Sequence, residues 1–393
     1  PAGSWNYVGY PISEGIVVKD SDDVAFDGNK VETTLGGAIG SYDTIYAIAF
    51  KNSNNAIISN NDIEAAGHTY IYAVQVSGDN FRIAANNITS TSDNYYANGI
   101  DVEGPATGEI EDNGILAKGV TLSYPIYSGM NGKDVKVNYT ANDLAGEAYF
   151  VLGMSLGDVE SNLEGNTIDI KGNYATGIAF KGAKLNVSAN AIYANASNVG
   201  NEYIWETFGV ETVGAKVVAG VATIKNNNVK TTGQYSVKVG NTTSTVTDNF
   251  LAANELFGDA SVNYTGDAVV KDNRGIATEL VYSQSKTVLL TAIKKGSYFN
   301  IVLKDEKGNV LASKNVTVKF NGKTSVAVTD KNGAIKYKLT ATKTGTKTLT
   351  MEFAGEDVYD VVVGEATIKI TKEKSKLTAN KKTFKAKTKT KNL

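Results

Sequence analysis

The acidic residues between Asp101 and Asp112 are the side chains whose type and spacing are best suited to chemistry. Asp101 and Glu103 alternate along one extended segment, which places both carboxyl groups on the same side of a strand. Glu109, Glu111 and Asp112 follow a few residues later. Pairs of carboxyl groups carry out acid–base cleavage of glycosidic bonds, so these residues define a candidate site for cleaving a polysaccharide.

The surroundings of this acidic face argue against catalysis. Charge that develops on a sugar acid must be stabilised by cations, yet the chain has only two arginines, far apart in the sequence. The outward positions expected on neighbouring segments are Gln75 and Ser77, then Ala49 and Lys51, a mixed set that does not extend a catalytic row. We therefore interpret Asp101 and Glu103 as a solvated acidic surface and expect no catalytic residue. A polysaccharide lyase or glycoside hydrolase is the alternative.

Composition excludes several other kinds of site. The chain has no Cys and one His, which rules out thiolate zinc sites, iron–sulfur clusters, disulfides and a Cys nucleophile. His68 has no acid or nucleophile nearby in the sequence and is interpreted as a loop residue. Asp20, Asp22 and Asp23 lack the Gly and Glu of a calcium-binding loop and are read as turn residues. We expect neither a metal nor a cofactor.

Aromatic residues in polar segments are the candidates for ligand binding. Such side chains stack on sugar rings or anchor a protein partner, because one face of the ring can be desolvated at low entropic cost. The alternative is that these rings pack onto the fold or cap it. The candidates are Tyr203, Trp205, Phe208, Tyr124, Tyr127, Tyr95 and Tyr96.

A short motif, apolar-x-x-Asn-x-apolar, recurs through the first 280 residues. It begins with Phe26–Asn29–Val31, and its last copy, around Asn273, is degenerate because Gly275 replaces the final apolar residue. Successive asparagines are 22 to 37 residues apart, which is the signature of a repeat architecture. The asparagines are Asn29, Asn61, Asn86, Asn113, Asn142, Asn166, Asn190, Asn227, Asn249 and Asn273.

Each repeat contains short segments of alternating apolar residues, such as Gly99–Val102, and no helical periodicity. A unit this small cannot bury its apolar side alone, but stacked units share one core. The pattern predicts an all-β protein whose first domain is a right-handed parallel β-helix of about ten coils. We expect each motif asparagine to adopt the left-handed backbone conformation at a bend and to bond to the asparagine of the next coil, forming an Asn ladder.

The charge distribution predicts two bodies. Residues 1–280 carry 16 Lys and Arg against 32 Asp and Glu, whereas residues 281–393 carry 23 against 9. The acidic first part would repel phosphate, so nucleic acid is not an expected partner.

No apolar run is long enough to span a membrane. We assign 1–280 to the β-helix, 281–372 to a second domain and 373–393 to a basic tail.

Residues 281–372 contain about seven short alternating segments, one of them Val288–Ile293, separated by turn sequences such as Asp330–Gly333. This count favours an immunoglobulin-like β-sandwich. The tail repeats its opening, since Leu290–Lys295 matches Leu377–Lys382 at an offset of 87 residues. The tail is therefore interpreted as the first strand of a further, truncated repeat. A basic tail without that role is the alternative.

Two resemblances follow from these patterns. Residues 10–278 resemble pectate-lyase-like β-helix proteins, a group that includes both enzymes and adhesins. The whole chain, with its Lys- and Thr-rich repeat and the tail motif at 376–387, resembles the adhesin-like surface proteins of methanogenic archaea. That resemblance implies an extracellular, non-enzymatic protein of the cell surface, whose β-helix is displayed on an immunoglobulin-like stalk.

The same resemblance suggests the partners. They would be a glycan or a surface protein of another cell, and the protein's own cell wall through downstream repeats. A structural spacer without a ligand is a further alternative.

Overall fold

The computed structural model describes residues 12–35, 43–128, 134–198, 203–205, 208–240 and 243–374, with the backbone alone for 203–205 and 208–210. The chain forms two compact units: the first ends at Ile276, the second begins at Ala277, and Asp357–Asp360 is grouped with the first. Strands dominate both, so the fold is all-β. The residues expected to open a further repeat, from Ser375 onward, lie outside the described ranges. The described residues contain no helix with the length and apolarity needed to cross a bilayer.

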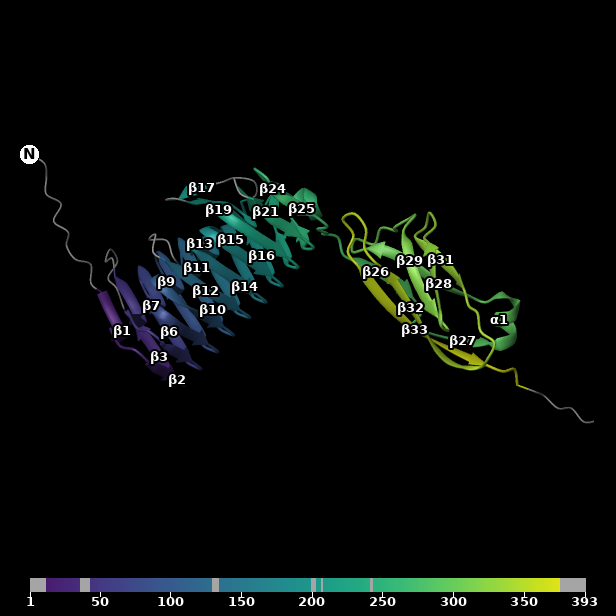
Figure 1. The fold of residues 1–393 in the computed structure, drawn as a ribbon, viewed down its shortest axis with the longest axis horizontal. Helices are drawn as coiled ribbons and strands as arrows, with labels where there is room; N and C mark the ends of the chain where they lie inside the picture. Colours follow the sequence, from purple (N-terminus) through teal and green to yellow (C-terminus); the bar gives the residue numbers. More distant parts are fainter. Residues whose placement is uncertain are drawn as a thin grey trace, which may run out of the picture. The chain divides into compact units, whose positions relative to one another are not determined.

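The first unit is a parallel β-solenoid, as the repeats predict, and its strands pair in parallel from coil to coil (Figure 1). Each coil contributes to three stacks of strands, and the long strands bend from one stack into another. The first stack contains, in order, β1 (Ile12–Lys19), β4 (Thr44–Lys51), β7 (Tyr70–Ala84), β9 (Tyr96–Glu111), β11 (Leu122–Ser128), β13 (Asp143–Leu156), β15 (Thr167–Ser188), β19 (Val213–Lys225), β21 (Tyr235–Val239) and β24 (Val262–Tyr264).

The other two stacks complete the coil. The second contains β2 (Ala25–Asp27), β5 (Ile57–Ser59), the ends of β7 and β9, β12 (Val135–Thr140), β14 (Glu160–Glu164), the ends of β15 and β19, β22 (Thr245–Thr247) and β25 (Val269–Lys271). The third contains β3 (Lys30–Thr34), β6 (Asp62–Gly67), β8 (Asn87–Ser92), β10 (Gly114–Lys118), the starts of β13 and β15, β16 (Ala191–Ala196), β20 (Asn228–Thr231) and β23 (Phe250–Ala252).

The motif asparagines form a hydrogen-bonded ladder at the bend between the second and third stacks. In Asn142, the backbone N–H and the side-chain Nδ2 both donate to Oδ1 of Asn166, at 3.0 and 2.9 Å. Nδ2 also donates to the carbonyl of Ile110 at 2.8 Å. The same paired donation links each asparagine to the next from Asn29 to Asn273. These bonds satisfy the polar groups that the bend would otherwise bury unpaired.

Asp259 provides the acceptor at the last rung. It lies in the short 3₁₀ helix η1 (Gly258–Ser261). Its Oδ1 accepts from the backbone N–H and Nδ2 of Asn273, at 3.1 and 2.7 Å, as the asparagine of a further coil would.

The expectation that the ladder asparagines adopt the left-handed conformation is wrong by one residue. The positive φ angle belongs to the residue before each asparagine, for example Ala141 at 54° and Gly165 at 67°. The asparagine itself is held by its side chain in the ladder. Positions with positive φ are occupied by Gly, Asn and Asp, but also by Ala at residues 85, 141 and 189. A residue with a Cβ carries strain there, which the ladder bonds on the following residue offset.

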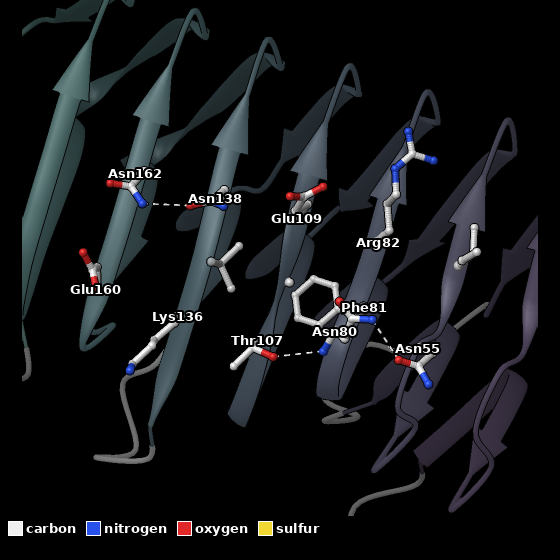
Figure 2. A pocket seen from close by; sticks show the side chains of 13 residues that line it. Asn55, Asn80, Phe81, Arg82, Thr107, Glu109, Lys136, Asn138, Glu160 and Asn162 are labelled. Carbon is white, nitrogen blue, oxygen red and sulfur yellow. Dashed lines mark hydrogen bonds between the residues drawn. The ribbon is translucent and has the colours of Figure 1, made fainter.

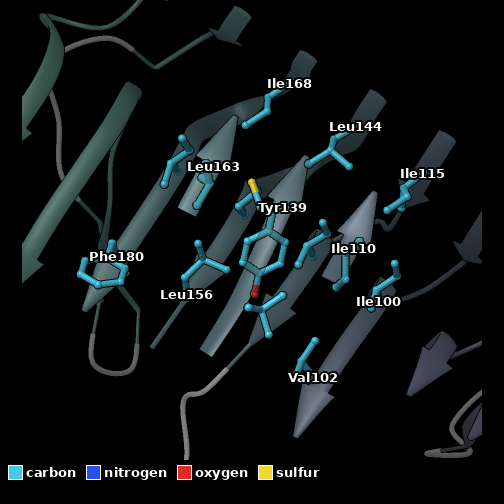
Figure 3. Packing of buried hydrophobic residues seen from close by; sticks show 14 of the residues in the cluster. Ile100, Val102, Ile110, Ile115, Tyr139, Leu144, Leu156, Leu163, Ile168 and Phe180 are labelled. Atoms are coloured by element: carbon cyan, nitrogen blue, oxygen red, sulfur yellow. The ribbon is translucent and has the colours of Figure 1, made fainter. Parts of the chain in front are cut away.

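Apolar side chains fill the interior between the stacks. Ile110, Tyr139, Leu144, Leu163 and others are almost completely buried and contact one another across successive coils (Figure 3). Equivalent positions in consecutive coils stand over one another at the spacing of paired strands, about 4.8 Å. One core therefore runs through the solenoid, and it fixes which side chains of each strand face outward.

The second unit contains two sheets. A three-stranded sheet has the order β26 (Thr278–Tyr282), β28 (Tyr298–Asp305) and β31 (Ala334–Lys338). A five-stranded sheet has the order β27 (Ser285–Leu289), β33 (Val362–Thr371), β32 (Gly345–Phe353), β29 (Asn315–Phe320) and β30 (Lys323–Val328). Buried residues alternate along both, such as Phe299 and Ile301 in β28, and Val316 and Val318 in β29.

The predicted strand Val288–Ile293 is wrong in its second half. β27 ends at Leu289, and Leu290–Gly296 forms the helix α1, which buries Ile293. Alternation of apolar residues over so short a segment does not distinguish a strand from one helical turn.

Replacing Asn166 with Ala tests the ladder. The side chain accepts two hydrogen bonds from Asn142 and donates to Asn190 and to the carbonyl of Tyr139. Since the neighbouring groups would remain buried without partners, we expect a loss of about 2–4 kcal/mol in the free energy of unfolding. Chemical denaturation should show it, with the exposed Lys171→Ala as control. Equal midpoints for the two variants would contradict the ladder's contribution.

Candidate functional site

The structure brings four of the predicted ligand-binding tyrosines together on the outer surface of the first stack. Tyr96 lies in β9, Tyr124 and Tyr127 lie in β11, and Tyr95 directly precedes β9. These side chains belong to an aromatic cluster separate from the solenoid core. We call this surface the tyrosine face, and it consists of Tyr46, Tyr70, Tyr72, Tyr95, Tyr96, Tyr124, Tyr127, Tyr149, Phe150 and Tyr174.

The rings of the tyrosine face contact one another from coil to coil. The ring centroids of Tyr46 and Tyr72 are 4.8 Å apart, with their planes 20° from parallel. Tyr72 continues to Tyr96 at 5.3 Å, and Tyr96 to Tyr124 at 5.4 Å. These are attractive separations for aromatic pairs, so the rings hold one another in place. The result is a row of aromatic side chains along the axis of the solenoid.

Part of this row reaches solvent. Tyr149 is 48% exposed, and Tyr46, Tyr70, Tyr72, Tyr95 and Tyr127 are half-buried. Tyr96, Tyr124 and Tyr174 retain less than a tenth of their accessible surface. The face therefore combines packed aromatic side chains with others that remain partly exposed to solvent.

The interpretation of Asp101 as a solvated residue is wrong. It faces outward from β9, as predicted, but only 6% of its surface is exposed. Gln75 is its neighbour on β7, and Gln75 Nε2 donates to Asp101 Oδ2 at 3.3 Å. Burial, and then the charge of Glu103, raises the pKa of Asp101 to about 7. Glu103 itself is exposed, as expected.

Three tyrosines of the face interact electrostatically with the carboxyl group of Asp101. Burial raises the pKa of Tyr46 to about 12, and the negative charge of Asp101 adds to that effect. Burial followed by neighbouring tyrosines and Asp101 also raises the pKa values of Tyr72 and Tyr96. These phenols therefore stay protonated and uncharged at neutral pH.

Two buried side-chain oxygens of residues near Asp101 in the sheet have no hydrogen-bond partner. They are the side-chain oxygens Oε1 of Gln75 and Oδ1 of Asn98, both buried. The nitrogen of each amide is used, by Gln75 toward Asp101 and by Asn98 toward the hydroxyl of Tyr96 at 3.2 Å. Buried amide oxygens are rarely left unpaired, so this polar centre within the tyrosine face is incomplete as it stands.

A second surface lies on the outer side of the second stack. It is a groove of about 600 Å³ across β5, β7, β9, β12 and β14 (Figure 2). Arg82 Nε donates to Glu111 Oε1 at 2.6 Å, and Glu109, the register partner of Arg82, also lines the groove. Lys136 and Glu160 stand on the adjacent strands. The coil geometry thus pairs Arg82 with carboxylates distant in sequence, whereas Asp112 occupies a left-handed turn position beside the ladder.

The remaining predicted positions fall elsewhere. Residues Tyr203–Trp205 (β17) and Phe208–Val210 (β18) form an antiparallel pair, so the long insertion contains a hairpin. The side chains of Tyr203, Trp205 and Phe208 lie outside the described part of the structure.

His68 does have an acidic neighbour, because its Nδ1 is 2.6 Å from Oδ1 of Asp93 in the next coil. Within the described residues no group of His, Asp and Glu is arranged to hold a metal ion.

Comparison with known proteins gives no family assignment. No protein family, curated protein or solved structure matches the chain. Function must therefore be argued from the surfaces of the solenoid itself.

The stability of an Asp101→Asn variant tests the burial of this carboxyl group. The folded pKa of about 7 lies above the reference value of 3.8, so the folded state holds the proton more tightly and wild-type stability falls as pH rises from 4 to 7. Asn carries no charge, so the variant should lose this pH dependence and exceed the wild type by a few kcal/mol above pH 7. Denaturation at pH 5 and pH 8 measures the free energy of unfolding of both proteins. An equal pH dependence in the two would show that Asp101 is solvated.

Proposed function

We propose that this chain is a non-enzymatic adhesin of the cell surface that binds a carbohydrate through the tyrosine face. The observation that carries the proposal is the continuous row of aromatic rings on one outer surface of the solenoid. Sugar rings present apolar C–H faces that stack on aromatic side chains, and hydroxyl groups that bond to phenols and amides. The tyrosine face offers both kinds of contact side by side.

The geometry of a parallel solenoid suits a linear oligosaccharide. Tyr46, Tyr72, Asn98 and Tyr124 are register partners on four consecutive strands of the first stack. Equivalent side chains recur at the strand spacing, about 4.8 Å, so an extended polymer lying along the axis meets a similar contact at each coil. Many such contacts add up although each one is weak.

The remaining parts of the proposal rest on the resemblance to adhesin-like surface proteins of methanogenic archaea. We propose on this basis that the solenoid is a right-handed parallel β-helix and that the second unit is an immunoglobulin-like stalk. A sandwich is supported by two sheets with alternating buried residues. The ring centroids of Phe320 in one sheet and Tyr337 in the other are 6.4 Å apart. The protein would be extracellular, with downstream repeats leading to its own cell wall and the solenoid directed toward another cell.

Tyr72→Ala is the variant that tests this function. Tyr72 stacks on Tyr46 and contacts Tyr96, so its removal interrupts the row. On a glycan array followed by titration, we expect the variant to lose about 1–3 kcal/mol of binding free energy for the glycan that the wild type selects.

Tyr264→Ala is the matched control, because Tyr264 lies on the last strand of the same stack and is 48% exposed. It should bind as the wild type does. A wild-type protein that selects no glycan on a broad array, or equal affinity for both variants, would refute the function.

The groove favours a second candidate, a polysaccharide-cleaving enzyme. The groove contains Glu109 and its register partner Arg82, and Arg82 is bonded to Glu111 on the same strand as Glu109; glycosidic cleavage uses such a combination of carboxylates and a cation. If this activity exists, wild-type protein should release reducing or unsaturated ends from a polysaccharide panel, and Glu109→Gln should reduce the rate by about 100-fold or more. An inactive wild type, or an equally active Glu109→Gln, excludes this role for Glu109.

A further inference from the structure

Two buried carboxyl groups of the solenoid have opposite surroundings. Asp158 is completely buried and accepts hydrogen bonds from three hydroxyl groups: Ser128 Oγ at 2.5 Å, Ser161 Oγ at 2.6 Å and Tyr139 OH at 3.0 Å. Both carboxyl oxygens of Asp158 are thus hydrogen-bonded. Asp101 is nearly as buried, but within the described residues its one hydrogen-bond donor is Gln75, at 3.3 Å.

No positive charge compensates Asp101 among the described residues. The charged group that acts on it is Glu103, two residues further along β9, which adds a second negative charge. Lys51 lies at the edge of the same face, with Nζ 5.2 Å from the ring centroid of Tyr46, but its ammonium is bonded to Glu14 at 2.6 Å. A buried carboxyl group without a cation is costly, and such groups concentrate at functional sites.

The atoms that lack partners at this point are all acceptors. Gln75 Oε1 and Asn98 Oδ1 are buried without a donor; Gln75 is the register partner of Asp101 on β7, and Asn98 precedes Asp101 by three residues on β9. The missing partner must therefore be rich in donors and, to compensate Asp101, positive. An alkylammonium group meets both conditions, since it has three N–H donors and no acceptor. Aromatic rings add to this preference, because their faces attract cations.

We propose that Asp101, Gln75 and Asn98 form a subsite for the amino group of an amino sugar, within the tyrosine face. The inference rests on the proposed carbohydrate binding and specifies its ligand. The rings of Tyr46 and Tyr72 bind the sugar, and the ammonium group enters beside Asp101 and donates to the carboxylate and the two amide oxygens. Entry requires one of the half-buried tyrosine rings to turn aside. The net charge of −16 on residues 1–280 also favours the approach of a cationic ligand.

Three oligosaccharides with the same β-1,4-linked backbone isolate the amino group. Chitosan hexamers carry amines, chitin hexamers carry acetylated amines, and cellohexaose carries hydroxyl groups. We expect the full chain, titrated at pH 6.5 in 150 mM salt, to bind the chitosan hexamer about 10-fold more tightly than the other two. Binding should also release a proton from Asp101, because the ammonium favours the carboxylate, and this is measured from binding enthalpies in two buffers.

Asp101→Asn is the decisive variant, and the denaturation experiment described above checks that it folds. It should reduce the preference for the chitosan hexamer to about 2-fold or less, change affinity for cellohexaose little, and lose the proton release. Glu103→Gln is the matched control: it removes one exposed negative charge from the same strand and should retain the preference. If both variants weaken chitosan binding equally, the attraction is general electrostatics and the subsite is refuted.

The outcomes for the two proposals can be told apart. Binding of all three hexamers with similar affinity overturns the amino-sugar subsite and leaves carbohydrate binding intact. If the chitosan hexamer does not bind but the array identifies another glycan, the amino-sugar subsite is likewise overturned and carbohydrate binding is retained. Failure on the hexamers and on the whole array removes the subsite and carbohydrate binding together.

Discussion

The hydrogen bonds of the asparagine ladder are the constraint on which the rest of the solenoid depends. Each ladder asparagine lies at a bend where backbone groups turn inward, and its amide pairs with the coil on either side. The bend recurs at the same place in every coil because the ladder tolerates no shift of register. A shift of one residue would exchange inward and outward side chains along every strand. The ladder therefore decides which residues appear on the surface.

This register converts spacing in the sequence into rows on the surface. Gln75, Asp101 and Tyr127 are separated by 26 residues each and become neighbours on three consecutive strands. The same alignment places the tyrosines over one another on the first stack, and Arg82 beside Glu109 on the second. Two surfaces of different chemistry thus arise on one scaffold, one aromatic with a buried acid, the other charged and hollowed. Only the aromatic one contains buried polar atoms that lack partners beside an uncompensated carboxyl group, within the residues described.

The repeat, the parallel solenoid and the ladder could be read from the sequence because Asn recurs in fixed register with two apolar positions. Tyr95, Tyr96, Tyr124 and Tyr127 could be proposed from composition, but Tyr46, Tyr72 and Tyr174 were missed. Tyr46 and Tyr72 are register partners in the structure, but they lie 15 and 14 residues before Asn61 and Asn86, so an alignment of the ladder asparagines alone does not superpose them. The burial of Asp101 could not be foreseen, because strand alternation predicts that its side chain faces outward but not what packs over that surface. The helix α1 was missed because local alternation does not reveal which side of a short segment is covered.

A crystal structure of the chain with a bound oligosaccharide tests the central claim, that the tyrosine face is the recognition surface of this protein. The account predicts a sugar ring stacked on the side chains of Tyr46 and Tyr72, with a polar substituent within hydrogen-bond distance of Asp101. An oligosaccharide bound instead in the groove lined by Arg82 and Glu109, with the tyrosine face empty, would contradict it.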